Sequence, residues 1–372
     1  AAGVRAEPFL AVPDRGRLPK DLGLLRERGW APYHRNLFKA DRPFWRDWFV
    51  NLSALSDSAF AWRQQPTRAD AAALNPGDIG ISDLGRGQHV FNQTLLIGAN
   101  LFQGDGAYRP PDWQLRFSLG VNVNRFDAGV KGVTAAHAAA SEVRTSTTVG
   151  LQALSLRRHL ATVSAYYDFD AIELGVQAIN LDHRGFLFFD NALAARVFGT
   201  RDNNSWQYSV LWLRRFEKAT NSQLNTTELR DEDVFAANIF RQDWPRPGIN
   251  VAVTLAHHRD RNDDRRVDDN GFVVRPVPLI GSRRERLNTT YVGLSSDGHL
   301  GWLNLTTQIY KAFGEARLPS ADEDIDGWFL AAEFSRDIDW TRWRTSLLFA
   351  SGDTDPNDGQ RDGFGAIFEN PL

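Results

Sequence analysis

Residues 113–126 read WQLRFSLGVNVNRF, and this stretch decides the fold. Every second residue from Trp113 to Val123 is large and apolar, whereas the residues between them are polar or glycine. A period of two residues predicts a β-strand, because successive side chains point to opposite sides of a pleated backbone. The stretch therefore predicts a strand with one apolar face and one polar face.

The same alternation returns along most of the chain. It is clear in segments 91–102, 113–126, 248–258, 328–335 and 341–350. Weaker candidates cover residues 48–62, 146–158, 170–180, 193–199, 205–217, 233–242, 286–295 and 299–313. About a dozen strands of roughly ten residues each suit tilted crossings of a bilayer. The predicted fold class is all-β, an antiparallel transmembrane β-barrel with about 12 or more strands that this chain leaves incomplete.

In such a barrel the apolar strand faces meet lipid and the polar faces line the lumen. The residues expected to face outward are Leu115, Phe117, Leu119, Val121, Val251, Val253, Leu347 and Phe349. Tryptophans near strand ends, at 113, 206, 328 and 340, suit the membrane–water interface. The core of a soluble β-sandwich would account for the same aromatic residues, so that alternative stays open.

Composition narrows the function classes. The chain has 372 residues, a net charge of -3 and 42% hydrophobic residues. No run approaches the roughly eighteen apolar residues of a membrane-spanning helix, so a membrane role requires a barrel. The near-neutral charge gives no support for nucleic-acid binding. Cysteine is absent, which excludes disulfides, thiolate metal ligands and a cysteine nucleophile.

The chain divides into two parts of different character. Residues 1–47 carry five prolines and one short helical candidate at 20–28, which predicts an irregular N-terminal periplasmic or plug-like segment. Residues 48–372 hold the barrel strands. The Ala1-Ala2-Gly3 start fits a removed secretory signal peptide, and hence a bacterial outer-membrane location. Residues 364–372 do not alternate, so we expect further strands beyond them or from a partner.

Several charged residues fall on the polar faces of the predicted strands. These candidate lumen or solute-binding residues are Arg116, Glu173, Arg241, Glu333, Arg342 and Arg344. Basic residues outnumber acidic ones among them, so the field inside a water-filled lumen would favour anions. Pairing of arginine with glutamate across neighbouring strands, which only holds the wall together, explains the same charges.

One acidic stretch is a candidate calcium site. Asp353, Asp355, Asn357 and Asp358 place oxygen ligands close together, as a hard cation requires. The stretch departs from the EF-hand pattern, since Phe364 stands where a bidentate glutamate is expected. A capped turn rich in Asp, Asn and Gly gives the same sequence. No other cofactor is expected.

Two further groups are interpreted as structural. Acidic and basic residues interleave between 259 and 269, which is typical of a solvated loop. His257 and His258 are adjacent, and neighbours in a strand face opposite ways, so a shared metal site is not expected. The chain lacks G-x-S-x-G, H-E-x-x-H and phosphate-binding glycine motifs, so the sequence does not predict an enzyme.

The segment 348–371, LFASGDTDPNDGQRDGFGAIFENP, resembles the alginate-export-type family of porin-like outer-membrane barrels of Gram-negative bacteria. Segments 91–105, 182–191 and 206–225 are similar in style to large porin-like proteins. The resemblance implies a single-chain barrel with a basic lumen that passes an anionic polysaccharide. This chain lacks a closing amphipathic strand and a dense set of lumen arginines, so the fold carries over better than the substrate.

The leading hypothesis is an outer-membrane channel that passes solutes, or an anionic or sugar-like polymer, through a polar lumen. Its surroundings would be outer-membrane lipid and lipopolysaccharide, with no nucleic-acid partner. Two alternatives stay open. One is a structural sleeve that holds a partner protein of the envelope, such as a periplasmic or electron-carrying subunit. The other is a soluble all-β carbohydrate-binding protein or enzyme.

Overall fold

The computed structural model describes residues 22–24, 28–29, 31, 33–34, 36–63, 87–104, 110–128, 141, 143–166, 168–219, 222–261, 286–318, 322–355 and 358–368. The long strands are β1 (Trp48–Arg63), β2 (Gln88–Gln103), β3 (Trp113–Asp127), β4 (Val143–Thr162), β5 (Phe169–Asn180), β6 (Phe189–Arg201), β7 (Trp206–Lys218), β8 (Asn225–Arg241), β9 (Ile249–Asp260), β10 (Arg286–Leu300), β11 (Leu303–Arg317), β12 (Asp322–Ile338) and β13 (Thr341–Ala350). A two-residue strand, β14 (Gln360–Arg361), follows them. Over these ranges no helix is long and apolar enough to cross a membrane.

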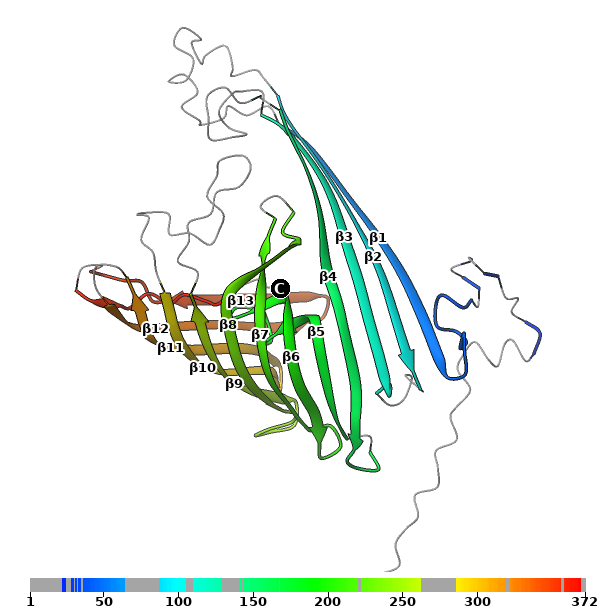
Figure 1. Cartoon of the computed structure of the whole chain (residues 1–372). Helices are drawn as coiled ribbons and strands as arrows, with labels where there is room; N and C mark the ends of the chain where they lie inside the picture. The colour runs from blue at the N-terminus through cyan, green and yellow to red at the C-terminus, as the bar shows by residue number, and fades with distance from the viewer. Residues whose placement is uncertain are drawn as a thin grey trace, which may run out of the picture.

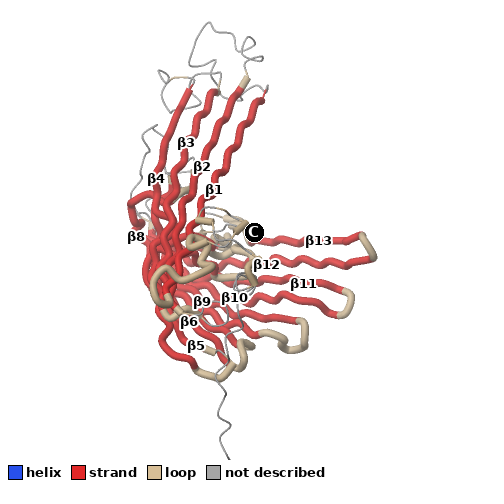
Figure 2. The backbone as a smooth tube through the Cα atoms, turned by 90° about the vertical axis from the view of Figure 1, so that its right-hand side faces the viewer, coloured by secondary structure: helices blue, strands red, loops and turns tan. Residues whose placement is uncertain are grey.

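Strands β1 to β13 form one antiparallel sheet in which each strand pairs with its neighbours in sequence, and β14 pairs parallel with β12. The sheet curls, with β5 to β13 wrapping around and β1 to β4 rising as long, gently bent strands (Figures 1 and 2). Among the strands in the described part, β1 pairs only with β2 and β13 only with β12. The sheet is therefore not closed, and it is consistent with an incomplete β-barrel.

Each segment predicted from alternation overlaps a strand, so the all-β prediction is confirmed. The segment predicted at 299–313 begins too early, because residues 301–302 form the turn between β10 and β11. The boundaries differ most in β8 and β12, which begin at Asn225 and Asp322 rather than near 233 and 328. Both extensions are rich in polar residues on both faces. A strand that is polar on both sides keeps its backbone pairing but loses the alternation that reveals it.

The two faces of the sheet carry opposite chemistry. The side chains predicted to face outward share one side, and they are exposed or partly exposed: Phe117 is 37% exposed and Val253 is 50% exposed. On the other side, Gln114, Asn122 and Thr254 are buried. Cross-strand register keeps directly paired residues on one side, so these assignments extend from strand to strand. The apolar face is thus the exposed one.

Two segments far apart in the sequence meet on the inner side of the sheet. Residues 181–188, between β5 and β6, lie against residues 364–368, and Phe188 pairs with Phe368 in a parallel bridge. The backbone N–H of Phe368 donates to the Leu187 carbonyl at 3.2 Å, and that of Phe189 donates back to Phe368 at 3.1 Å. These contacts fasten the two segments together inside the curled sheet.

The buried apolar side chains around these segments form what we call the inner core. Tyr310 lies against Gly293 of the neighbouring strand, where a Cβ would come within 2.1 Å of the ring, so only glycine fits. Other members are Ile179, Leu181, Phe186, Leu187, Phe188, Leu213, Val234, Tyr291, Phe329 and Ile367. Much of the inner side of β5 to β12 is therefore filled by the chain itself.

The connections at one end of the sheet are short, and we call this end the short-turn edge. It holds the connections from β4 to β5, β6 to β7, β8 to β9, β10 to β11 and β12 to β13. The turn at 242–248 holds Pro245 and Pro247. The tightest reversal follows β12, which continues to Ile338, so that only Asp339 and Trp340 reverse the chain. Asp339 has φ 52°, a left-handed conformation that aspartate tolerates in turns.

The N-terminal part is described only in pieces. Phe38 accepts a hydrogen bond from the Leu52 backbone at 2.8 Å, and Lys39 bridges to Asn51, so residues near 38 run along β1. Of the helical candidate at 20–28, the structure describes residues 22–24 and 28, which are in turn or irregular conformation rather than helix. Residues 262–285 of the charged loop lie outside the described residues.

Candidate functional site

A cluster of arginines surrounds one buried carboxylate on the inner wall of β3 to β6. Glu173 of β5 is 2% exposed at its side chain. Arg157 of β4 binds it through Nε and Nη2, at 2.9 and 2.6 Å from Oε2, and Ser155 Oγ donates to Oε1 at 2.8 Å. Two charge-assisted hydrogen bonds to one oxygen and a hydroxyl bond to the other fix the carboxylate in place.

Two more guanidinium groups approach the same carboxylate. Arg116 of β3 places Nη1 3.8 Å from Glu173 Oε1, and its side chain remains 43% exposed. Arg196 of β6 pairs with Glu173 in the register, and its Nε donates to Ser209 Oγ at 2.9 Å. Arg157 and Arg196 both lie over the Phe198 ring, at 5.0 and 4.5 Å from its centroid.

We call Arg116, Arg157, Arg196 and Glu173 the arginine cluster. Within the described residues, no second carboxylate forms an ion pair with any of the three guanidinium groups. Three positive charges therefore face one negative charge, and the wall is locally positive. Because the wall is partly dehydrated, its field extends further than it would in bulk water.

The wall beside the cluster is lined with amide side chains. Asn122 Nδ2 donates to Asn92 Oδ1 at 2.6 Å and to Thr94 Oγ1 at 2.8 Å. Gln114 Nε2 donates to Asn100 Oδ1 at 2.9 Å, and Arg116 Nη2 donates to Gln114 Oε1 at 3.2 Å. Amide groups both donate and accept, so this surface suits polar solutes without fixing their charge.

Three further predicted residues lie at the far edge of the sheet, also on the polar side. Arg344 of β13 places Nε 3.3 Å from Glu333 Oε1, and Arg184 places Nη1 3.3 Å from Glu333 Oε2. Arg342 binds Asp337 at 2.5 and 2.9 Å. Asp337 neutralises Arg342, and Arg344 shares the Glu333 carboxylate with Arg184. Both are the cross-strand pairing that the sequence analysis kept as an alternative.

The register contradicts the face assigned to Arg241. This residue is paired with Trp206 of β7 and Val251 of β9, both on the apolar side. Its guanidinium lies 4.6 Å from the Trp206 ring centroid and 3.2 Å from Asp202 Oδ2. Ile239 lies two residues earlier and therefore on the same face. Its apolar side chain already indicates that Arg241 lies on the outer side.

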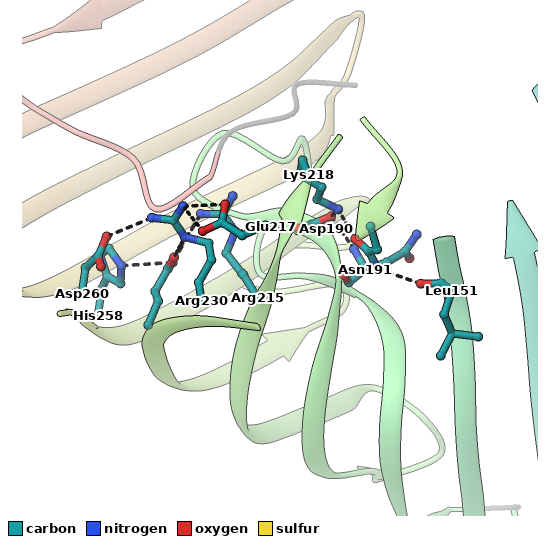
Figure 3. Close-up of polar contacts among 11 residues, drawn as sticks. Leu151, Asp190, Asn191, Arg215, Glu217, Lys218, Arg230, His258 and Asp260 are labelled. Atoms are coloured by element: carbon teal, nitrogen blue, oxygen red, sulfur yellow. Dashed lines mark hydrogen bonds and ion pairs between the residues drawn. The ribbon is translucent and has the colours of Figure 1, made fainter. Parts of the chain in front are cut away.

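Sequence reasoning missed a buried ionic network between β7, β8 and β9 (Figure 3). Glu232 is completely buried, with Arg230 Nε at 2.8 Å, His258 Nε2 at 3.1 Å and Arg215 Nη1 at 3.3 Å. Arg230 also reaches Glu217 at 3.2 Å. The first half of β8 is polar on both faces. Because this run does not alternate, the sequence did not indicate which of its charged side chains point inward.

Part of this network has the composition of a metal site. One ligand atom from each of Glu232, His258 and Asp260 lies within 4.8 Å of the others, the only such group in the described ranges. Arg230 contacts both carboxylates, at 2.8 Å from Glu232 and 3.5 Å from Asp260, so a guanidinium already takes the place of a cation. The group therefore fits an ion-pair network better than a metal site.

The candidate calcium residues lie in a turn after β13. The Asp353 carboxylate accepts from the Asp355 backbone at 3.2 Å, and the Asp358 carboxylate accepts from the Gln360 backbone at 2.8 Å. Such bonds are typical of capped turns. Asn357 lies outside the described residues, and the other three form no three-ligand group there. Calcium binding stays a prediction.

A polar pocket of about 450 Å³ lies beside the 181–188 segment on the inner side. Its lining residues are His183, Arg184, Phe240, Asn250, Asp297, Thr306 and Glu333. The pocket combines both charge signs with one aromatic ring. It shows that the inner core does not fill the interior completely toward the short-turn edge.

No protein-family model matches the chain, and no curated protein matches it. The resemblance of segment 348–371 to alginate-export-type barrels therefore stays a prediction from the motif.

Proposed function

We propose that this protein is an outer-membrane channel whose lumen favours anionic solutes. The observation that carries the proposal is the inverted surface: large apolar side chains are exposed along the strands, while polar and charged side chains occupy the inner side. Water-soluble β-proteins place these two classes the other way round.

The exposed apolar surface is too extended to be left in water. Residues such as Leu115, Val210, Phe235, Leu294 and Leu347 continue it from β3 to β13. Contiguous apolar patches beyond a few hundred Å² mark interaction or membrane surfaces, and burial is worth roughly 25 cal/mol per Å². Lipid is the surrounding that removes this cost for every strand at once.

In lipid, the backbone N–H and C=O groups at the two edges of the sheet also need hydrogen-bond partners. Unpaired backbone groups cost several kcal/mol each in hydrocarbon, so spanning sheets are closed. We therefore infer that β1 and β13 are bridged by further strands in the membrane.

The solute path that we propose follows the inner wall of β2 to β6. The inner core covers much of the inner side of β5 to β12, and the amide-lined wall and the arginine cluster lie outside it as a polar surface for a solute. Arginine groups beside Phe198 and amides suit carboxylates, phosphates or acidic sugars. The resemblance to alginate-export-type barrels agrees with such a solute.

The alternatives have less support. A sleeve needs room for a partner protein, and the inner core takes up much of that room. A soluble carbohydrate-binding protein or enzyme would leave the apolar face in water. Neither alternative explains the inverted surface as well.

Planar-bilayer recording tests the proposal. The refolded protein is added to a bilayer that separates two KCl concentrations, and the reversal potential reports the ratio of chloride to potassium permeability. We expect discrete conductance steps with a preference for chloride. A correctly folded sample that stays soluble without detergent, or one that inserts and never conducts, would overturn the channel.

A further inference from the structure

The outer face carries arginines stacked on aromatic rings at the short-turn edge. Arg158 of β4 lies over the Trp113 ring at 4.4 Å, and Arg336 of β12 lies over Trp302 at 4.6 Å. Two more pairs are Arg241 over Trp206 at 4.6 Å and Arg201 over Tyr208 at 5.3 Å. We call Arg158, Arg201, Arg241 and Arg336 the outer arginine belt.

The register places the belt on the apolar side. Arg158 is paired with Trp113, which shares its face with Leu115, and Arg336 is paired with Trp343, which is 69% exposed. Each of the four arginines lies within a few residues of a short turn. Belt residues from strands β4, β6, β8 and β12 therefore line one rim of the outer surface.

Tryptophan is concentrated at the same rim. Eight of the twelve tryptophans lie there: Trp45, Trp48, Trp113, Trp206, Trp244, Trp302, Trp340 and Trp343. Trp340, in the turn between β12 and β13, is 95% exposed. Indole rings favour the membrane–water interface because they combine an apolar body with one N–H donor. The rim therefore marks the depth of lipid headgroups.

The four arginines differ in one respect. Arg201 is 2.8 Å from Asp170, and Arg241 is 3.2 Å from Asp202, so both are neutralised. Arg158 and Arg336 have no carboxylate within ion-pair distance among the residues that the structure describes. An indole ring orients each of these two guanidinium groups. Because no described carboxylate is paired with them, they are available to bind an external anion.

We propose that Arg158 and Arg336 each bind the phosphate group of a glycerophospholipid in the leaflet at the short-turn edge. The inference rests on the proposed membrane location and goes beyond it. A planar guanidinium suits phosphate oxygens, and the neighbouring indole packs on the glycerol and upper acyl region. Short turns of outer-membrane barrels lie on the periplasmic side, where this lipid class would be met.

The spacing of charges favours a phospholipid over lipopolysaccharide. Arg158 and Arg336 stand on β4 and β12, and the two belt arginines on strands between them, Arg201 and Arg241, carry their own carboxylates. A lipid with several phosphates would be matched by several free cations close together. One free arginine beside one indole matches one phosphate.

Native mass spectrometry of the full chain tests this inference. The protein is released from detergent micelles that contain either dioleoyl phosphatidylglycerol or dioleoylglycerol, which lacks the phosphate. The wild type is expected to retain the phosphatidylglycerol preferentially. R158Q/R336Q should weaken that retention by about fivefold for each arginine removed. R158K/R336K keeps the charge and should retain most of the lipid.

R201Q/R241Q is the matched control, because it removes the same charge from the same rim where carboxylates already neutralise it. Equal loss in the two glutamine variants would overturn the assignment to Arg158 and Arg336. Stronger retention of lipid A than of phosphatidylglycerol would overturn the choice of lipid. A protein that enters bilayers and conducts but shows no dependence on these residues refutes this inference alone, whereas failure to enter bilayers refutes the proposed function.

Discussion

Arg116 and Glu173 approach each other across β4, with Arg116 Nη1 3.8 Å from Glu173 Oε1. Arg157, on the strand between them, holds the same carboxylate at 2.6 Å, so Arg116 contributes a second positive charge to a site that is already paired. A second cation around one anion adds little to the strength of the wall. It does add to the field in the lumen.

Removing the excess charge of the arginine cluster should lower anion selectivity. We expect R116Q/R196Q to reduce the chloride preference in planar-bilayer recordings, more at 0.1 M than at 1 M salt, because the Debye length falls from about 10 to about 3 Å. R342Q is the comparison, since Asp337 already neutralises Arg342. An equal loss of chloride preference per arginine removed in the two variants would show that the cluster does not set the field.

A charge placed on the outer face should oppose membrane insertion. We expect F117R to lower the free energy of unfolding in phospholipid vesicles by up to about 2–4 kcal/mol, because an arginine side chain is costly near the bilayer midplane. N124R, on the polar side of the same strand, is the matched control and should cost less. Urea titration followed by tryptophan fluorescence measures both. A larger loss in N124R would mean that the polar face is the one in contact with lipid.

Loosening the 181–188 segment should widen the passage. The Asp182 carboxylate accepts backbone hydrogen bonds from Arg184 at 2.9 Å, Phe186 at 3.2 Å and Leu187 at 2.7 Å. We expect D182A to leave these donors unsatisfied, at about 1–3 kcal/mol for a buried group. Single-channel conductance should rise and become noisier.

Asn180 offers a control at the same place. Its side chain accepts one hydrogen bond, from the Asp182 backbone at 3.1 Å. N180A should therefore leave conductance close to wild type. Wild-type conductance in D182A would show that the segment does not narrow the path.

Asp168, outside the strands, ties two turns of the short-turn edge together. Its carboxylate accepts from the Asn204 backbone at 2.8 Å, the Asn203 backbone at 2.9 Å and Ser164 Oγ at 2.8 Å. Burial opposes ionisation, but these hydrogen bonds outweigh it, so the pKa of Asp168 lies below its usual value. The stabilisation is present above the unfolded-state pKa and is lost as the pH falls through the folded-state pKa.

D168N should remove this pH dependence. The amide carries no charge and offers only one acceptor oxygen, so the variant should melt at a lower temperature than wild type at neutral pH. Thermal melts by circular dichroism between neutral and strongly acidic pH should show the difference shrinking as the pH falls. A constant difference across that range would mean that ionisation of Asp168 does not contribute.

The strands and their faces were readable from the sequence because the period of two is a local property of each strand. Alternation in 113–126 was enough to place Leu115 and Phe117 outside and Arg116 inside, and the same reasoning placed Glu333. The prediction from alternation failed at the start of β8, where the residues are polar on both faces. It also placed Arg241 on the wrong face, although Ile239, two residues earlier on the same face, is apolar and indicates the outer side.

What the sequence by itself determined is therefore the fold class, the approximate positions of the long strands and the two opposite faces. Only the tertiary structure decided which charges meet: that Arg157 and Arg196 join Arg116 around Glu173, and that Arg230 stands between Glu232 and Asp260. It also brought residues 181–188 onto residues 364–368 to fill the inner side. These contacts depend on the register between strands and on the curl of the sheet. Both are set by pairing between distant segments, which leaves no periodic trace in any one of them.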